Sequence, residues 1–353
     1  MLNQLTTHLA ASRSLDTDQV RMAVGQLVDE GISAEIKAGF LTALARKGET
    51  TGEITEFARA LRDKSIAPPL DPETRAREIL DVCGTGGDRL GTFNISTTVA
   101  IVCTAAGVIV AKHGNRAITS QAGSADVLEA LGVRIDLPPA EAARSLREHG
   151  FAFFFAPNYH PAFKHIAPAR KFCAERGQPT IFNFLGPLLN PARPSAQLVG
   201  VPRPELCEPI AHVLQSLGVR RGMVVCGKVS GANGRVLGAA SLDELSTLGP
   251  NTVAEFYQEH GFITSVLSPD QFSLQAAALT DLLGSDRQAN AEIVRRILHG
   301  DERGPKRDAV LLNAGAALFV AGRVRSISEG WELAAETIDG GQAQAKLRDL
   351  VTR

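Results

Sequence analysis

The chain has 353 residues, of which 44% are hydrophobic and 21% charged, the balance of an ordinary globular protein. Its formal net charge is −1 and it has no run of basic residues, which argues against nucleic acid or an anionic membrane surface as the main partner. The amino terminus lacks the apolar core of a signal peptide, and the longest nearly apolar run, 99–111, is too short to cross a bilayer. The five cysteines have no CxxC spacing and read as reduced thiols, so we expect a cytoplasmic protein.

Residues 1–66 carry helix signals only. Asp16, Ser33 and Thr50 can each cap a helix, and Glu53 can form a capping box with Thr50. Apolar residues recur at helical spacing after each cap. These stripes predict three short helices, with Val20, Val24, Leu27 and Val28 in the first, Ile36, Phe40 and Leu44 in the second, and Ile54, Phe57 and Leu61 in the third. Three short helices have a limited core, so we expect this unit to pack on something else, such as another subunit.

After a helix-breaking linker at 67–73, short apolar runs alternate with helix periods. The strand-like runs are 78–83, 108–112, 151–156, 197–201 and 222–227. The helical periods are 97–107, 124–132, 139–150, 204–218, 290–300, 308–322 and 326–338. Continuously apolar strands interleaved with helices are typical of a parallel sheet covered on both faces. The predicted fold class is therefore α/β, with a small N-terminal helical domain and a larger α/β domain that has a mainly parallel central sheet.

The stretch "DVCGTGGDRLGTFNIST" (81–97) follows the first strand and is rich in glycine. Ligands in such folds bind beyond the carboxyl ends of the strands. Gly84, Gly86 and Gly87 let backbone N–H groups approach an anion closely. The stretch is not a GxGxxG fingerprint, because Arg89 takes the place of the third glycine, and it lacks the lysine of a Walker loop.

Glycines alone could also form a tight structural turn. The polar residues around them, however, favour a ligand loop: Asp88 and Asn94 stand in the stretch, and Ser96 and Thr97 open the following helix. Hydroxyls and free amides at a helix N-terminus favour phosphate.

The second strand ends in "VAKHGNRAITSQAGSAD" (110–126), which gathers cations, amide and imidazole donors, and hydroxyls. Each of these residues alone could be a solvated surface side chain, but their density favours a second ligand loop. Two adjacent phosphate-compatible loops suggest a substrate with more than one phosphate group. The residues concerned are Lys112, His113, Asn115, Arg116, Thr119, Ser120 and Ser124.

Together with these loops, the motifs "CGTGGD", "NIST", "KHGNRAITSQAGSADVLEALGV", "FFFAPNYHPAFKHIAPAR", "TIFNFLGPLLNP" and "LDEL" resemble the anthranilate phosphoribosyltransferase family of tryptophan biosynthesis over essentially the whole chain. The resemblance implies a transferase that moves the phosphoribosyl group of 5-phosphoribosyl 1-pyrophosphate to the amine of anthranilate, with Mg²⁺ as cofactor. It also implies a homodimer formed through a helical domain at 1–66, which helices near 160–190 could complete, and a phosphoribosyl-pyrophosphate-binding α/β domain at 74–353.

The resemblance further implies site residues. Those for phosphoribosyl pyrophosphate are Gly84, Gly87, Asp88, Thr92, Asn94, Ile95, Ser96, Thr97, Lys112, His113, Gly114, Asn115, Arg116, Ala117, Ile118, Thr119, Ser120 and Ser124. Those for anthranilate are Gly84, Asn115 and Arg170, with His160 and Pro187 in segments that line its channel. Those for Mg²⁺ are Ser96, Asp243 and Glu244. No general base is assigned, because the leaving pyrophosphate needs charge neutralisation rather than a strong base.

Three positions depart from the family pattern. Thr119 replaces a serine but keeps the hydroxyl, Ser241 replaces a glycine before the acidic pair, and Pro179 replaces an arginine. Three other functions remain open. A nucleoside phosphorylase would be revealed by phosphorolysis. A type I phosphoribosyltransferase would show an acidic pair followed by a phosphate turn after an apolar strand, which we do not find. A nucleic-acid-binding relative of the same fold is disfavoured by the near-neutral charge.

Overall fold

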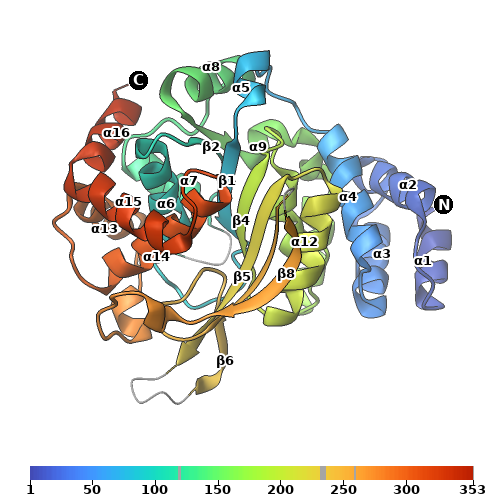
Figure 1. Ribbon diagram of the computed structural model, residues 1–353. Coiled ribbons are helices and arrows are strands. Elements are labelled where there is room, and N and C mark those ends of the chain that lie inside the picture. Colours follow the sequence, from blue (N-terminus) through green and yellow to red (C-terminus); the bar gives the residue numbers. More distant parts are fainter. Residues whose placement is uncertain (118–120, 231–235, 258–259, 353) are drawn as a thin grey trace.

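A computed structural model describes residues 1–117, 121–230, 236–257 and 260–352. An eight-stranded sheet lies between two layers of helices, and a bundle of N-terminal helices packs at one side (Figure 1). This arrangement confirms the predicted fold class. None of the helices within these residues is long and apolar enough to cross a membrane.

The N-terminal bundle contains four helices: α1 (Leu2–Ala10), α2 (Thr17–Val28), α3 (Ala34–Lys47) and α4 (Thr51–Asp63). Asp16, Ser33 and Thr50 cap α2, α3 and α4 as expected, and capping boxes form at Asp16 and Thr50. Helix α1 was not predicted; its buried leucines recur at three- and four-residue spacing. On the predicted stripe of α3, Phe40 and Leu44 are fully buried, whereas Ile36 is 37% exposed.

Helix α10 (Ala167–Glu175) packs against α3, and the residues that lead into it share a hydrophobic cluster with the bundle. The segment around residues 160–190 therefore lies between the bundle and the sheet. Helix α9 (Ala156–Tyr159) directly precedes this segment, which also contains α11 (Phe182–Leu185). The predicted domain boundaries at 66 and 74 stay a prediction.

Five parallel strands form the centre of the sheet in the order β3-β2-β1-β4-β5. Their bounds are β1 Ile79–Gly84, β2 Ile109–Gly114, β3 Phe151–Phe155, β4 Ala196–Gly200 and β5 Arg221–Ser230. The remaining strands, β6 (Val236–Leu242), β7 (Asn251–Tyr257) and β8 (His260–Leu267), extend the sheet in antiparallel fashion beyond β5. These three strands were not predicted.

The two faces of the sheet bury different helices. One face is covered by α6 (Ile95–Ala105), α7 (Ser124–Ala130), α13 (Arg287–His299), α14 (Pro305–Val320), α15 (Ile327–Asp339) and α16 (Gln342–Val351). The other face is covered by α12 (Cys207–Ser216) and the N-terminal bundle. Two further helices, α5 (Pro72–Ala76) and α8 (Pro139–His149), lie near the β3 edge (Figure 1).

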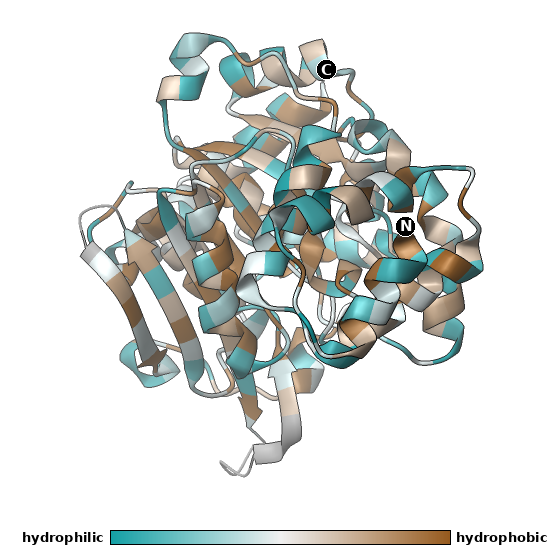
Figure 2. Ribbon diagram, turned by 90° about the vertical axis from the view of Figure 1, so that its right-hand side faces the viewer, coloured by the Kyte–Doolittle hydropathy of each residue, from teal (hydrophilic) through white to brown (hydrophobic). Residues whose placement is uncertain are grey.

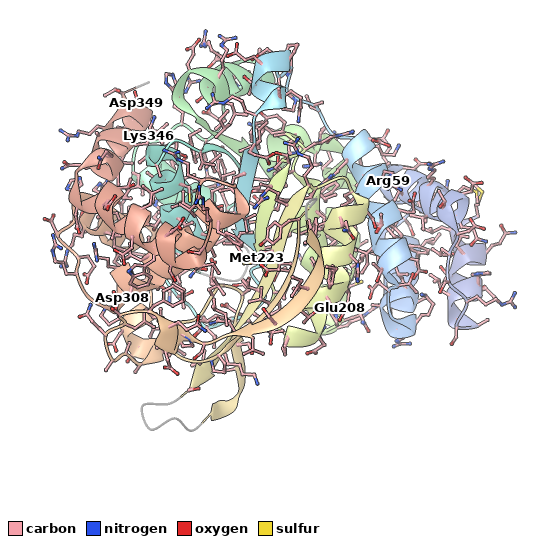
Figure 3. The ribbon with its side chains drawn as sticks, viewed as in Figure 1. Arg59, Glu208, Met223, Asp308, Lys346 and Asp349 are labelled. Carbon is pink, nitrogen blue, oxygen red and sulfur yellow. The ribbon has the colours of Figure 1, made fainter. Side chains whose placement is uncertain are left out.

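Strand β5 shows why the strands are continuously apolar. Met223, seen at the middle of the sheet in Figure 3, and Val225 join the cluster under α14, whereas Val224 and Cys226 join the cluster under α12. Successive residues of a strand point to opposite faces, so a sheet covered on both faces needs apolar residues throughout.

Candidate active site

The polar loops gather at the carboxyl ends of β1, β2 and β4. Strand β1 ends at Gly84 and β2 at Gly114, and Gly84 pairs with Gly200 at the end of β4. This edge of a parallel sheet is where such folds bind ligands. The two glycine- and hydroxyl-rich loops therefore lie side by side, as the sequence predicts.

An acidic segment, 243–246, crosses these strand ends directly over three glycines. A methyl group on Gly200 would lie 1.6 Å from the Asp243 carbonyl oxygen, and one on Gly84 would lie 2.7 Å from the Asp243 carboxylate. A methyl group on Gly227 of β5 would lie 2.6 Å from the Glu244 carbonyl oxygen. Real Cβ atoms do not approach this closely, so glycine is required at all three positions for the segment to pass.

Both carboxylates of this segment are buried, with Asp243 7% and Glu244 9% exposed. Asp243 Oδ2 accepts hydrogen bonds from the Gly86 N–H and, at 3.3 Å, from the Thr85 hydroxyl. Burial raises the pKa of both carboxyls. The nearby Asp88 raises the pKa of Asp243 further, and Asp243 does the same to Glu244. Asp88, Asp243 and Glu244 therefore lie close enough for their negative charges to repel one another.

Asp88, Asp243 and Glu244, together called the acidic group, offer oxygen donors that fit Mg²⁺. Asp88 Oδ2 is buried and has no hydrogen-bond partner among the described residues. No three His, Cys, Asp or Glu side chains in the described part of the chain form a complete metal centre. Mg²⁺ commonly uses one or two carboxylates and completes its shell with water and substrate phosphates, so a partial set of protein ligands suits it. Ser96 lies beside this group, since its backbone lowers the pKa of Glu244 by hydrogen bonding.

The N-terminus of α6 lies beside these acidic residues and has features of a phosphate site. Asn94 occupies the cap position but makes no side-chain cap bond, and the first turn carries no acidic residue. Two amides of this turn are already bonded, since the Ile95 N–H donates to the Phe93 carbonyl at 2.7 Å and the Ser96 backbone bonds to the Glu244 carboxylate, so an anion bound here would lie next to Glu244. The Thr97 hydroxyl is buried without a partner in the described residues. Thr92, on the approach to the helix, forms a bridge with Leu283.

The Asn94 side chain ties three segments together. Its Nδ2 donates to the Ala122 carbonyl at 3.2 Å, and its Oδ1 accepts from Asn290 Nδ2 at 2.9 Å. Asn290 lies in the first turn of α13 and also accepts from the Ser285 N–H. The two ligand loops are thus joined by one amide, and Asn290, which sequence reasoning missed, holds that amide in place.

Lys112 lies beneath the N-terminus of α6 rather than in the open site. Its ammonium donates to the Val82 carbonyl at 2.7 Å and to the Ser96 hydroxyl at 3.3 Å. Burial lowers its pKa, whereas Asp81 and Glu244 oppose that shift. The positive charge of Lys112 also lowers the pKa of Glu244, which partly offsets the effect of burial on that carboxyl.

The second loop is braced by its own ion pairs. Arg116 binds Glu129 through two bonds of 2.8 and 2.9 Å and Asp126 at 3.1 Å, which raises its pKa. In this state its guanidinium is engaged by the protein. The Ser124 hydroxyl donates to the Asn115 carbonyl at 3.4 Å. Three predicted site residues, Ile118, Thr119 and Ser120, lie outside the described residues.

Asp126 shapes the same loop. It accepts from the backbone N–H groups of Ala117 and Gly123, each at 2.9 Å. Gly114, at the start of the loop, has no room for a side chain, because a methyl group there would lie 2.3 Å from the Ser124 hydroxyl.

A wall of rings leads from the end of β2 to Arg170. The ring centroids of His113 and His160 are 5.3 Å apart, those of His160 and Phe163 5.0 Å, and those of Phe163 and Phe182 5.8 Å. The Arg170 guanidinium lies 5.2 Å from the centroid of Phe182. Burial lowers the pKa of His113 to about 3 and that of His160 to about 4, so both imidazoles are neutral at physiological pH. This wall suits a planar aromatic ligand with a carboxylate at the arginine end.

Behind the wall lies a buried polar network that sequence reasoning missed. Asp81 accepts from Asn190 Nδ2 at 2.8 Å and from the His113 N–H at 3.4 Å. Asn190 Nδ2 also donates to the Ala111 carbonyl, and Pro187 supplies a carbonyl to Gln197 at 3.0 Å. Burial raises the pKa of Asp81 to about 6. The available signal was an aspartate inside the apolar strand run at 78–83.

Two family models cover most of the chain. "Glycosyl transferase family, helical bundle domain" matches residues 3–65, and "Glycosyl transferase family, a/b domain" matches residues 76–344. The fold and the site thus define a glycosyl transferase with a helical and an α/β part.

Individual relatives are more specific. The anthranilate phosphoribosyltransferase of Petrotoga mobilis is 43% identical over 99% of this chain and 96% of its own length, and that of Symbiobacterium thermophilum is 45% identical over 98% and 96%. The crystal structure of the Thermus thermophilus enzyme has a TM-score of 0.86 and 40% identity, covering 99% of this chain and 98% of that one. The Saccharomyces cerevisiae enzyme in complex with PRPP (phosphoribosyl pyrophosphate) and Mg has a TM-score of 0.84 and 28% identity, with the same coverage. The chain belongs to the anthranilate phosphoribosyltransferase family, and the resemblance drawn from its motifs is confirmed.

Proposed function

We propose that the protein transfers the phosphoribosyl group of phosphoribosyl pyrophosphate to the amine of anthranilate, a step of tryptophan biosynthesis. The amine attacks C1 of the ribose, the bond from C1 to the pyrophosphate oxygen breaks, and the nitrogen loses a proton to solvent. The products are N-(5-phosphoribosyl)anthranilate and pyrophosphate. The observation that carries this proposal is that the phosphate-type N-terminus of α6, the acidic group and a wall of rings converge on the ends of β1 and β2.

Phosphoribosyl pyrophosphate would bind at the glycine loop and the α6 N-terminus. The absence of an acidic residue from the first turn of α6 and the unpartnered Thr97 hydroxyl among the described residues support this assignment. Lys112 would act through Ser96, to which it donates, rather than by direct contact with phosphate. Arg116 would have to release Glu129 before it could bind the substrate.

Asp243, Glu244 and Ser96 would hold Mg²⁺ together with the pyrophosphate oxygens, and the buried acidic group with its raised pKa values supports this. When bound, Mg²⁺ would neutralise charge on the leaving pyrophosphate. A yeast relative is described in complex with PRPP and Mg, which agrees with such a site. The glycines beneath the segment keep its carboxylates at the strand ends.

Anthranilate would lie along the wall of rings. Arg170 would pair with its carboxylate, and Asn115 and Gly84 would face its amine where the two substrates meet. The neutral imidazoles of His113 and His160 support an uncharged aromatic surface next to the arginine. A yeast relative is described in complex with 4-fluoroanthranilate.

We further propose that the enzyme is a cytoplasmic homodimer joined through its helical bundle. A groove of about 580 Å³ runs between α1, α3 and α10, with Leu9, Ala38 and Phe172 among its lining residues. Ile36 and Met22 are exposed on the same bundle, which faces the viewer in Figure 2. A second copy would cover this apolar surface.

The loss of anthranilate fluorescence on mixing with phosphoribosyl pyrophosphate tests the function. The expected result is a decrease that requires both phosphoribosyl pyrophosphate and Mg²⁺. No decrease with both present, together with phosphorolysis of a pyrimidine nucleoside, would instead identify a nucleoside phosphorylase.

A further inference from the structure

The acidic segment is held in place by a side chain from a distant part of the chain. Asn313 of α14 is fully buried, and its Oδ1 accepts from the Leu245 N–H at 2.9 Å while its Nδ2 donates to the Leu245 carbonyl at 2.9 Å. Nδ2 also donates to the Ala309 carbonyl, one turn back along the helix, at 2.9 Å. One amide therefore binds both backbone groups of the residue that directly follows Glu244.

Such a clamp matters because the segment belongs to no strand. Strand β6 ends at Leu242 and β7 begins at Asn251, so residues 243–250 have no regular ladder to fix them. Buried backbone groups need partners, and here a side chain supplies them. A second asparagine acts in the same way on the next residue: Asn251 Oδ1 accepts from the Ser246 N–H at 2.6 Å, and its Nδ2 donates to the Ser246 carbonyl at 3.1 Å.

Asn313 holds the acidic segment on one side, and three strand glycines contact it on another. A methyl group on Gly200 or Gly84 would clash with Asp243, and one on Gly227 would clash with Glu244 and Ser246, so the segment lies directly against these glycines. Helix α14 brings Asn313 to Leu245 of the segment. Asp308, labelled in Figure 3, lies in the first turn of α14, and Asn313 follows five residues later. The segment is thus held between glycines, which permit its close approach to the strands, and the Asn313 amide, which fixes its distance from the strand ends.

We propose that Asn313 is a positioning residue for the reaction, which fixes the Asp243–Glu244 pair at the distance from the strand ends that Mg²⁺ and pyrophosphate require. It touches neither substrate; it acts through Leu245. This inference rests on the proposed function, because it assigns the acidic pair to the metal and the pyrophosphate.

Titration calorimetry with phosphoribosyl pyrophosphate, with and without Mg²⁺ and in the absence of anthranilate, tests the proposal without turnover. Asn313→Leu keeps a similar volume in the helix but cannot bond to Leu245. We expect its Kd for phosphoribosyl pyrophosphate in Mg²⁺ to rise by about tenfold or more, while the KM for anthranilate changes by less than roughly threefold. The Mg²⁺ concentration needed for half-maximal turnover should rise with it.

Leu311→Ala serves as the matched control. Leu311 is buried two residues away on α14, which places it about 200° around the helix from Asn313. Its loss should lower the thermal unfolding midpoint and leave the Kd and the Mg²⁺ requirement unchanged. Should Asn313→Leu fail to fold, Asn313→Ser leaves room for water beside Leu245 and is measured instead.

The outcomes separate the two proposals. Unchanged Mg²⁺-dependent binding in the folded Asn313 variant, or an equal loss in Leu311→Ala, would overturn the positioning role and leave the proposed function standing. If the unaltered protein does not bind phosphoribosyl pyrophosphate in a Mg²⁺-dependent way, both proposals are overturned.

Discussion

Gly200→Ala should disable the enzyme through one methyl group placed outside the substrate-binding surface. That methyl group would lie 1.6 Å from the Asp243 carbonyl oxygen and 2.2 Å from its carbonyl carbon. Ordinary contacts of this kind are at about 3.4 Å or more, so the acidic segment would have to move by roughly 1.5–2 Å. A displacement of about 1 Å at a reacting centre can cost about a hundredfold in rate, so we expect at least that loss in kcat/KM.

Initial rates of anthranilate consumption measure the effect, and thermal unfolding shows whether the variant is folded. Overpacking of this kind costs about 1–3 kcal/mol, which a domain of this size can tolerate. Gly261→Ala is the matched control, because a methyl group on Gly261 in strand β8 meets nothing within 4 Å. Activity of folded Gly200→Ala within roughly threefold of the unaltered enzyme would refute the reasoning, because the segment could then occupy another place.

Arg170→Ala should raise the KM for anthranilate by about ten- to a hundredfold, because one charge-assisted pair contributes about 1.5–3 kcal/mol. The affinity for phosphoribosyl pyrophosphate should stay nearly intact. An unchanged KM for anthranilate contradicts the assignment. Sedimentation should show a dimer at micromolar concentration, and a monomer there would argue against the helical interface. His113 and His160 should each lower stability by about 1.4 kcal/mol per pH unit as the pH drops below about 6.5, because their pKa values of about 3 and about 4 in the folded state lie below the unfolded value. The raised pKa values of the buried carboxyls of Asp81, Asp243 and Glu244 act in the opposite direction over the same range. Urea midpoints between pH 7 and pH 4 test the contribution of His160, because the slope of stability against pH in His160→Gln should differ from that of the unaltered protein by about 1.4 kcal/mol per pH unit; equal slopes would show that His160 is not held neutral by burial.

Local signals in the sequence were sufficient for the starts of the capped helices α2, α3 and α4 and for the central strands. Asp16 and Thr50 cap helices through bonds to residues three positions away, so the information lies within one turn. The continuous apolar runs of β1 to β5 indicate burial on both faces, whatever their order in the sheet. Ile36 shows what local signals leave open: the helical spacing identifies which residues share the apolar face of α3, but it does not tell which of them are buried.

The candidate site was predictable as residue types and loops but not as an arrangement. Gly200 and Asp243 are in contact although they stand far apart in the sequence, and nothing local to either residue indicates that contact. The antiparallel strand β7 depends on pairing with β5, and β8 depends on pairing with β7, which a single sequence does not display. Asn313 stands in an otherwise apolar stretch of its helix, and a polar residue in such a run is a signal that a buried partner exists, although it does not say which.

The central claim is that the acidic segment over the strand ends binds the metal together with the pyrophosphate. Steady-state kinetics over a Mg²⁺ titration in the double variant Asp243→Asn, Glu244→Gln test it most directly, since both substitutions keep size and hydrogen bonding but remove two negative charges. The account predicts that most turnover is lost at every Mg²⁺ concentration while the protein stays folded and still binds anthranilate. Turnover and Mg²⁺ dependence like those of the unaltered enzyme would contradict it and reduce the pair to a structural role.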